Sequence, residues 1–194
     1  MCIRDSFVAA FTELVSVSVH AIDRFDKIAH ERRKTVGIWG DGNLGYITAI
    51  FFKAMFPEVK LCIFGLDENK LSDFTFADDT FSITSIPDDL SIDHAFECVG
   101  GEGSPKAINQ IIDYINPEGT ISILGVSETP VAINTRMILE KGLRMFGSSR
   151  SGRKDFEKTI ALYQSNPEIV EYLQNIIGAT VNVHTVEDLS LIHI

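Results

Sequence analysis

The decisive stretch is Gly40-Asp41-Gly42-Asn43-Leu44-Gly45, which lies between a β-rich run at residues 35–39 and an apolar run at residues 46–52. Its spacing is G-x-G-x-x-G at a strand–turn–helix junction. The first glycine permits the turn, the second lets the backbone approach a pyrophosphate, and the third lets helix and strand pack closely. The helix N-terminus offers unpaired N–H groups to phosphates. A turn that merely reverses the chain is the alternative, but both flanks favour a dinucleotide site.

The bulk properties are those of a globular protein, and they exclude several classes. A chain of 194 residues, 45% hydrophobic and 23% charged, is long enough for one domain and part of a second. The net charge of −10 argues against binding of nucleic acid or of an anionic membrane surface. Three cysteines, Cys2, Cys62 and Cys98, lie too far apart for a disulfide framework or a zinc cluster, so buried thiols and a cytoplasmic location are expected.

Strand-like and helix-like runs alternate after the glycine turn. Strands are expected at residues 60–64, 80–83, 93–99, 120–125 and 143–147, and helices at residues 44–56, 108–115, 135–141 and 155–164. Such alternation predicts βαβ units with right-handed crossovers. The expected fold is therefore α/β, a Rossmann doubly wound sheet of six parallel strands.

The chain divides by pattern into five parts. Residues 34–150 form the expected dinucleotide-binding domain, residues 7–33 a preceding helical segment, and residues 151–188 a C-terminal segment with a short strand at 180–184. Residues 1–6 and 189–194 continue no pattern of their neighbours and are interpreted as non-native tails. The expectation is a fragment of a longer protein.

The cofactor preference is predicted from the tip of the second strand. In dinucleotide folds an acidic residue about 20 positions after the glycine turn binds the ribose 2′-hydroxyl of NAD. Here that position is Gly65, with Asp67 and Glu68 expected in the turn beyond it. Because an acid would repel a 2′-phosphate and a glycine leaves space for one, NADP(H) is favoured over NAD(H). Lys70 is the candidate phosphate partner; a solvated surface lysine is the alternative.

Four segments give the chain a resemblance to a known family, namely residues 39–46, 93–104, 133–137 and 147–153. The chain resembles the medium-chain dehydrogenase/reductase family of zinc alcohol and polyol dehydrogenases. More narrowly, it is similar to bacterial ribulose-5-phosphate reductases of the teichoic-acid and capsule pathways. The resemblance implies NADPH-dependent reduction of ribulose 5-phosphate to ribitol 5-phosphate, which a cytidylyltransferase then activates. A homo-oligomer is also expected, with residues 121–124 and 130–134 near an edge used for dimers.

The resemblance also implies a catalytic zinc. Residues 11–17 resemble the Glu-Pro-Leu-Ser-Val segment of polyol dehydrogenases, which makes Glu13 a candidate ligand, although Leu14 replaces the proline. An exposed helix acid is the alternative for Glu13. The family's cysteine and histidine ligands come from a catalytic domain expected before Phe7, so residues 7–33 would be its helical remnant. Catalytic residues are therefore not assigned within this chain.

Further site residues are carried over from the family by position. Val99 and Gly100 would run beneath the adenosine and linking ribose, and Leu124 and Val126 would border the nicotinamide. Ser148 and Arg150, which follow the sixth strand, would hold the carboxamide of the nicotinamide through main-chain groups. Arg150 and Arg153 are also candidates to hold the sugar phosphate or the cofactor phosphate, because a guanidinium matches phosphate oxygens. A solvated linker is the alternative for both arginines.

Two other functions stay open. In the first, the chain as given acts only as an NADP(H)-binding module without turnover. In the second, the complete enzyme is a polyol dehydrogenase that acts on an unphosphorylated sugar.

Overall fold

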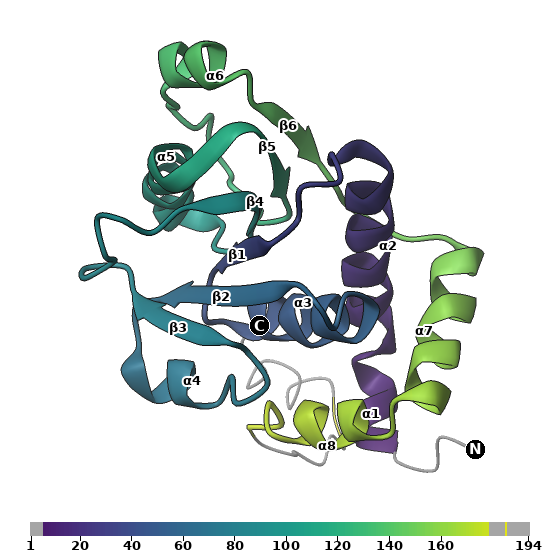
Figure 1. Ribbon diagram of the computed structural model, residues 1–194. Coiled ribbons are helices and arrows are strands. Elements are labelled where there is room, and N and C mark those ends of the chain that lie inside the picture. The colour runs from purple at the N-terminus through teal and green to yellow at the C-terminus, as the bar shows by residue number, and fades with distance from the viewer. Residues whose placement is uncertain (1–5, 179–184, 186–194) are drawn as a thin grey trace.

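The computed structural model describes residues 6–178 and 185 of the chain, and its centre is one sheet of six parallel strands (Figure 1). The strand order is β3-β2-β1-β4-β5-β6, and every neighbouring pair is parallel. The strands are β1 (Thr35–Trp39), β2 (Lys60–Gly65), β3 (Asp79–Ser82), β4 (Ile92–Glu97), β5 (Ile115–Ile123) and β6 (Arg144–Gly147). The expected six-stranded doubly wound sheet is confirmed, and the order reverses between β1 and β4, where such folds bind ligands.

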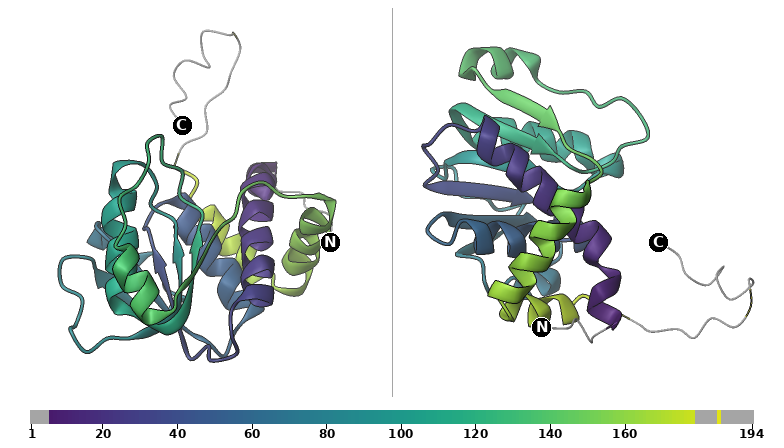
Figure 2. Two further views of the ribbon diagram at one scale, coloured as in Figure 1. Left: turned by 90° about the horizontal axis from the view of Figure 1, so that it is seen from above. Right: turned by 90° about the vertical axis from the view of Figure 1, so that its right-hand side faces the viewer.

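Helices cover both faces of the sheet (Figure 2, left). On one face lie α5 and α6, and on the other α3, then α2, then α7. The helices are α1 (Ser6–Ala10), α2 (Thr12–Ile28), α3 (Asn43–Met55), α4 (Glu68–Ser72), α5 (Ser104–Tyr114), α6 (Thr135–Lys141), α7 (Arg153–Ser165), α8 (Glu168–Gln174) and the 3₁₀ turn η1 (Gly101–Gly103). Among the described residues, no helix is long and apolar enough to cross a membrane.

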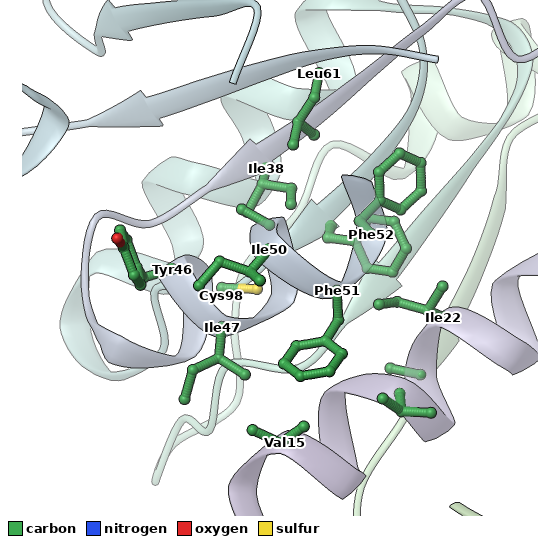
Figure 3. Close-up of a cluster of buried hydrophobic side chains, with 14 of the residues drawn as sticks. Val15, Ile22, Ile38, Tyr46, Ile47, Ile50, Phe51, Phe52, Leu61 and Cys98 are labelled. Carbon is green, nitrogen blue, oxygen red and sulfur yellow. The ribbon is translucent and has the colours of Figure 1, made fainter. Parts of the chain in front are cut away.

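The first core lies between the sheet and the layer of α2 and α3 (Figure 3). Ile38 and Leu61 point from β1 and β2 toward α3, whose Phe51 packs toward Val15 of α2. All four side chains are fully buried. Because α2 buries its apolar face against α3, residues 12–28 share one hydrophobic core with the sheet.

The second core lies on the opposite face, against α5. Alternate residues of the same strands reach it, because successive side chains of a strand point to opposite faces. Its centre is Trp39, which stacks on Phe64 with ring centroids 3.7 Å apart and is 1% exposed. The indole N–H donates to Oε1 of Gln110 at 2.9 Å, and the amide of Gln110 donates to the carbonyl of Ile83.

Two differences separate the observed elements from the expected ones, and one expected strand is not tested. Strand β5 begins at Ile115 rather than at residue 120, because Ile92 pairs with Ile115 and the register then shifts before His94 pairs with Thr120. Asp67 and Glu68 do not lie in a plain turn: the carboxylate of Asp67 caps α4, a helix that the sequence pattern did not indicate. The strand expected at residues 180–184 and both tails, apart from Ser6, lie outside the described residues.

His94 is a fully buried histidine on β4 that makes folding sensitive to acid. Its Nδ1 accepts the backbone N–H of Thr120 at 3.1 Å, and burial lowers its pKa from 6.5 to about 4. Below pH 6.5 the unfolded chain binds a proton that the folded protein excludes. The free energy of unfolding should therefore fall by roughly 3 kcal/mol between pH 6.5 and pH 4.

The matched variant is His94→Asn, which keeps an acceptor near Thr120 and cannot titrate. Urea denaturation at half-unit pH steps should show a flatter pH dependence in the variant. Equal slopes in both proteins would contradict the role given to His94.

Candidate nucleotide-binding site

The glycine turn joins β1 to α3 at the carboxyl edge of the sheet, and each glycine has the role that its position predicts. Gly40 has φ +128°, which side chains rarely adopt, and a Cβ there would lie 2.9 Å from the carbonyl of Cys98. A Cβ on Gly45 would lie 2.0 Å from the carbonyl oxygen of Gly40, so only glycine allows helix and turn to pack. Gly42 differs, because a Cβ there would meet nothing within 4 Å. That open side is the approach a pyrophosphate needs.

The N-terminus of α3 supplies hydrogen-bond donors at the same place. Gly42 is the N-cap residue and has no side chain to cap the helix. The first intrahelical bond from this end is donated by Tyr46 N–H to the carbonyl of Gly42. The N–H groups of Asn43, Leu44 and Gly45 therefore have no partner within the helix and stand free for an anion.

A cavity of about 260 Å³ opens beside this turn. Gly40 and Gly42 line one side, and the stacked rings of Trp39 and Phe64 belong to its wall. Gly65, Val99 and Lys106 also line it. An apolar slot with a few polar groups, at the point where the strand order reverses, suits the adenosine half of a dinucleotide.

Asp41 occupies the tip of β2, and the sequence did not indicate this. Its Oδ2 accepts the N–H groups of Leu66 and Asp67 at 2.7 and 2.8 Å. A Cβ on Gly65 would lie 2.7 Å from the Asp41 side chain. The expectation that Gly65 leaves open space is therefore wrong, because a carboxylate from the glycine turn fills it. Lys70 lines a separate cavity of about 160 Å³ on the other side of Gly42.

The turns after β4 and β5 lie against each other. Gly101 N–H donates to the carbonyl of Val126 at 2.6 Å, and a Cβ on Gly100 would lie 2.8 Å from that oxygen. Leu124 is buried, whereas Val126 is 81% exposed. The structure thus brings Gly100 against Val126, and the cofactor contacts carried over from the family for Gly100, Leu124 and Val126 stay predictions.

The segment after β6 crosses α2. Ser148 is buried, and its N–H donates to the carbonyl of Ile123. Arg150 has φ +64°, an unusual conformation for a side-chain-bearing residue. Arg150 and Arg153 line a cavity of about 550 Å³ against α2, with Arg24 and Lys27 on its opposite side. Arg153 also pairs with Glu157 at 2.7 Å.

Potential metal ligands do not gather in the described part of the chain. Within it, no group of three or more histidine, cysteine or acidic side chains could hold a metal ion. Glu13 is an exposed acid in the first turn of α2. Cys62 and Cys98 are free and buried, and burial raises the pKa of their thiols to about 11 and about 12. These thiols are inert, as predicted; Cys2 lies outside the described residues.

The parallel sheet and its strand order define an α/β fold of the Rossmann type. The zinc-binding dehydrogenase family matches residues 69–165, and the chain belongs to that family of oxidoreductases.

Named relatives make the comparison more specific. The chain is 55% identical to ribulose-5-phosphate reductase 2 of Staphylococcus aureus over 95% of its own length and 54% of the relative. It is 50% identical to ribulose-5-phosphate reductase of Bacillus spizizenii, over 94% of the chain and 54% of the relative. The crystal structure of S. aureus TarJ in complex with NADPH matches with a TM-score of 0.92 and 55% identity, over 96% of this chain and 59% of that chain. The chain thus spans about half the length of the curated relatives it matches.

Proposed function

We propose that the complete protein reduces ribulose 5-phosphate to ribitol 5-phosphate with NADPH, and that this chain supplies its cofactor-binding domain. The observation that carries the proposal is the glycine turn, with its open side at Gly42 and free N–H groups at the start of α3. The 55% identity to proteins named ribulose-5-phosphate reductase supports the substrate. We place the reaction in the supply of teichoic-acid and capsule precursors, upstream of a cytidylyltransferase.

NADPH is the proposed cofactor because a relative of 55% identity was crystallised with it. The β2 tip alone does not argue for a 2′-phosphate, since Asp41 brings a carboxylate there. Two backbone N–H groups partly offset that charge. Lys106 and Lys70 are the cations that line the cavities on the two sides of Asp41 and Gly42.

This chain's residues would bind and orient the cofactor. The turn and the α3 N-terminus would hold the pyrophosphate. The turn after β4 would run beneath the adenosine and linking ribose, and the turn after β5 would border the nicotinamide, which supplies hydride when bound. Zinc is implied by the family, but the described residues do not by themselves form a site for it. Glu13 is the candidate contribution of this chain, and we derive no step through the metal.

Titration of NADPH and NADH against the chain, followed by an assay of ribulose 5-phosphate reduction, tests the proposal. We expect NADPH to bind more tightly than NADH, and the chain alone to show binding without turnover. Absence of nucleotide binding would contradict the cofactor role. Equal activity of the full-length protein on ribulose and ribulose 5-phosphate would favour the polyol dehydrogenase alternative.

Arg150 and Arg153 are proposed to hold the sugar phosphate. Replacing both with alanine in the full-length protein should raise KM for ribulose 5-phosphate at least about tenfold, because charged hydrogen bonds to phosphate contribute about 1.5–3 kcal/mol each. The KM for NADPH should be unchanged if the arginines hold only the substrate. An unchanged KM for ribulose 5-phosphate would assign both arginines to a solvated linker.

A homo-oligomer and a cytoplasmic location complete the proposal. Strand β6 is an edge of the sheet, since it pairs with β5 and with no other described strand, and a second copy would find free backbone groups there. The two free buried thiols suit a reducing compartment.

A further inference from the structure

Glu97, the last residue of β4, is a buried carboxylate between the two turns that border the cofactor cleft. Its side chain is fully buried. Oε1 accepts the N–H groups of Val99 at 3.0 Å and Gly100 at 2.9 Å. Oε2 accepts the N–H of Gly125 at 3.2 Å, a donor that also reaches the main-chain oxygen of Glu97 at 3.0 Å. One carboxylate therefore joins the turn after β4 to the turn after β5.

Gly125 makes room for this carboxylate, and Gly100 lets the two turns approach each other. A Cβ on Gly125 would lie 2.7 Å from both Glu97 oxygens and 2.3 Å from the nitrogen of Gly100. Gly100 has φ +66°, and its neighbour Gly101 has φ +53°. Backbone in sparsely populated conformations gathers at functional sites, where the surrounding structure holds it in place.

Stability alone does not account for a carboxylate here. No lysine, arginine or histidine forms an ion pair with Glu97 within the described part of the chain. A buried charge without a counter-ion is costly, and neutral residues often stabilise such positions. The turns that Glu97 holds carry Val99, 43% exposed, and Val126, 81% exposed. These apolar side chains at the carboxyl edge of the sheet are free to contact a ligand.

We infer that Glu97 is a positioning residue for the nicotinamide half of the cofactor, acting through the main chain of Val99, Gly100 and Gly125. The inference rests on the proposed cofactor role. The strands β1–β3 form the mononucleotide half that takes adenosine, and β4–β6 form the other half. Glu97 joins turns of the second half, whereas the glycine turn and the β2 tip lie outside its hydrogen bonds.

The test compares two ligands on this chain, NADPH and 2′,5′-ADP, which lacks the nicotinamide half. The variant is Glu97→Gln. Its side-chain oxygen can accept the N–H groups of one turn, but its NH₂ group then faces an N–H donor of the other turn. NADPH affinity should fall about tenfold, and 2′,5′-ADP affinity should fall by less than about threefold, because of Val99, Gly100 and Gly125 only Val99 lines the adenosine cavity. The matched control is Glu58→Gln, an exposed residue just before β2 at the opposite edge of the sheet, which should change neither affinity.

Each other outcome is decisive. Equal loss of affinity for both ligands, or no loss for either, overturns the positioning role while the cofactor role stands. If the unaltered chain binds neither ligand, the proposed function fails, and this inference falls with it. If Glu97→Gln does not fold, hydrogen exchange of the unaltered chain decides: Val99, Gly100 and Gly125 amides should be protected although they lie outside strand pairing. Fast exchange at all three overturns the inference.

Discussion

Gly45→Ala should destabilise the chain by about 3 kcal/mol and abolish measurable nucleotide binding. The added Cβ would lie 2.0 Å from the carbonyl oxygen of Gly40, a backbone atom that cannot rotate away. Helix α3 and the turn would have to separate, and overpacking of this kind typically costs about 1–3 kcal/mol or more. Urea denaturation and a fluorescence titration with NADPH measure the two effects.

Gly42→Ala is the matched contrast to this variant. Its Cβ meets no protein atom within 4 Å, so the free energy of unfolding should change by less than about 1 kcal/mol. NADPH affinity should nevertheless fall at least about tenfold, because the methyl group takes the space through which a pyrophosphate approaches the main chain. A Gly42→Ala chain that binds NADPH like the unaltered chain would place the cofactor elsewhere.

Trp39→Ala should cost about 4 kcal/mol of folding stability, the other large expected effect. The indole is 1% exposed, stacks on Phe64 and donates to Gln110, so its removal leaves a cavity and an unpaired amide oxygen. Because Trp39 and Phe64 lie directly beside the cavity at the glycine turn, collapse of this packing should weaken adenosine binding as well.

Trp39→Phe is the milder variant at this position. It keeps a ring to stack on Phe64 but loses the N–H donor and the volume of the second ring, so about 1–3 kcal/mol should be lost. Chemical denaturation of both variants gives the comparison. A loss below about 1 kcal/mol for Trp39→Ala would show that the second core does not depend on this residue.

The fold could be predicted because its signals are local. The glycine spacing, the apolar strands and the helix at residues 135–141 are encoded by neighbouring residues, and apart from the start of β5 these elements lie within two residues of the expected bounds. Helix α4 was missed because it is short, and Asp67 starts it through a side-chain cap. The early start of β5 depends on a register shift against β4, which no local pattern encodes.

The site could be predicted only in part, for the same physical reason. The steric reasons for glycine at positions 40, 42 and 45 follow from their own turn, and the structure agrees with them, whereas nucleotide binding at the turn stays a prediction. Asp41 and Glu97 act on residues more than 20 positions away, Leu66 and Gly125, so their roles require the strand order. Asp41 occupies an x position of the G-x-G-x-x-G motif, which the motif leaves unspecified. Glu97 is the last residue of an apolar strand, and such a strand predicts a role in packing rather than in a site. Lys106 lines the cavity because α5 packs beside the cavity, and no local sequence pattern predicts that packing.

The central claim is that main-chain N–H groups at the β1–α3 junction bind the pyrophosphate of a dinucleotide. Amide nuclear magnetic resonance of the chain during titration with NADPH tests it most directly. Asn43, Leu44 and Gly45 should show the largest shifts and saturate together, because their N–H groups gain a charged acceptor. The account is contradicted if NADPH binding saturates while these three resonances do not move and shifts occur only in other parts of the chain.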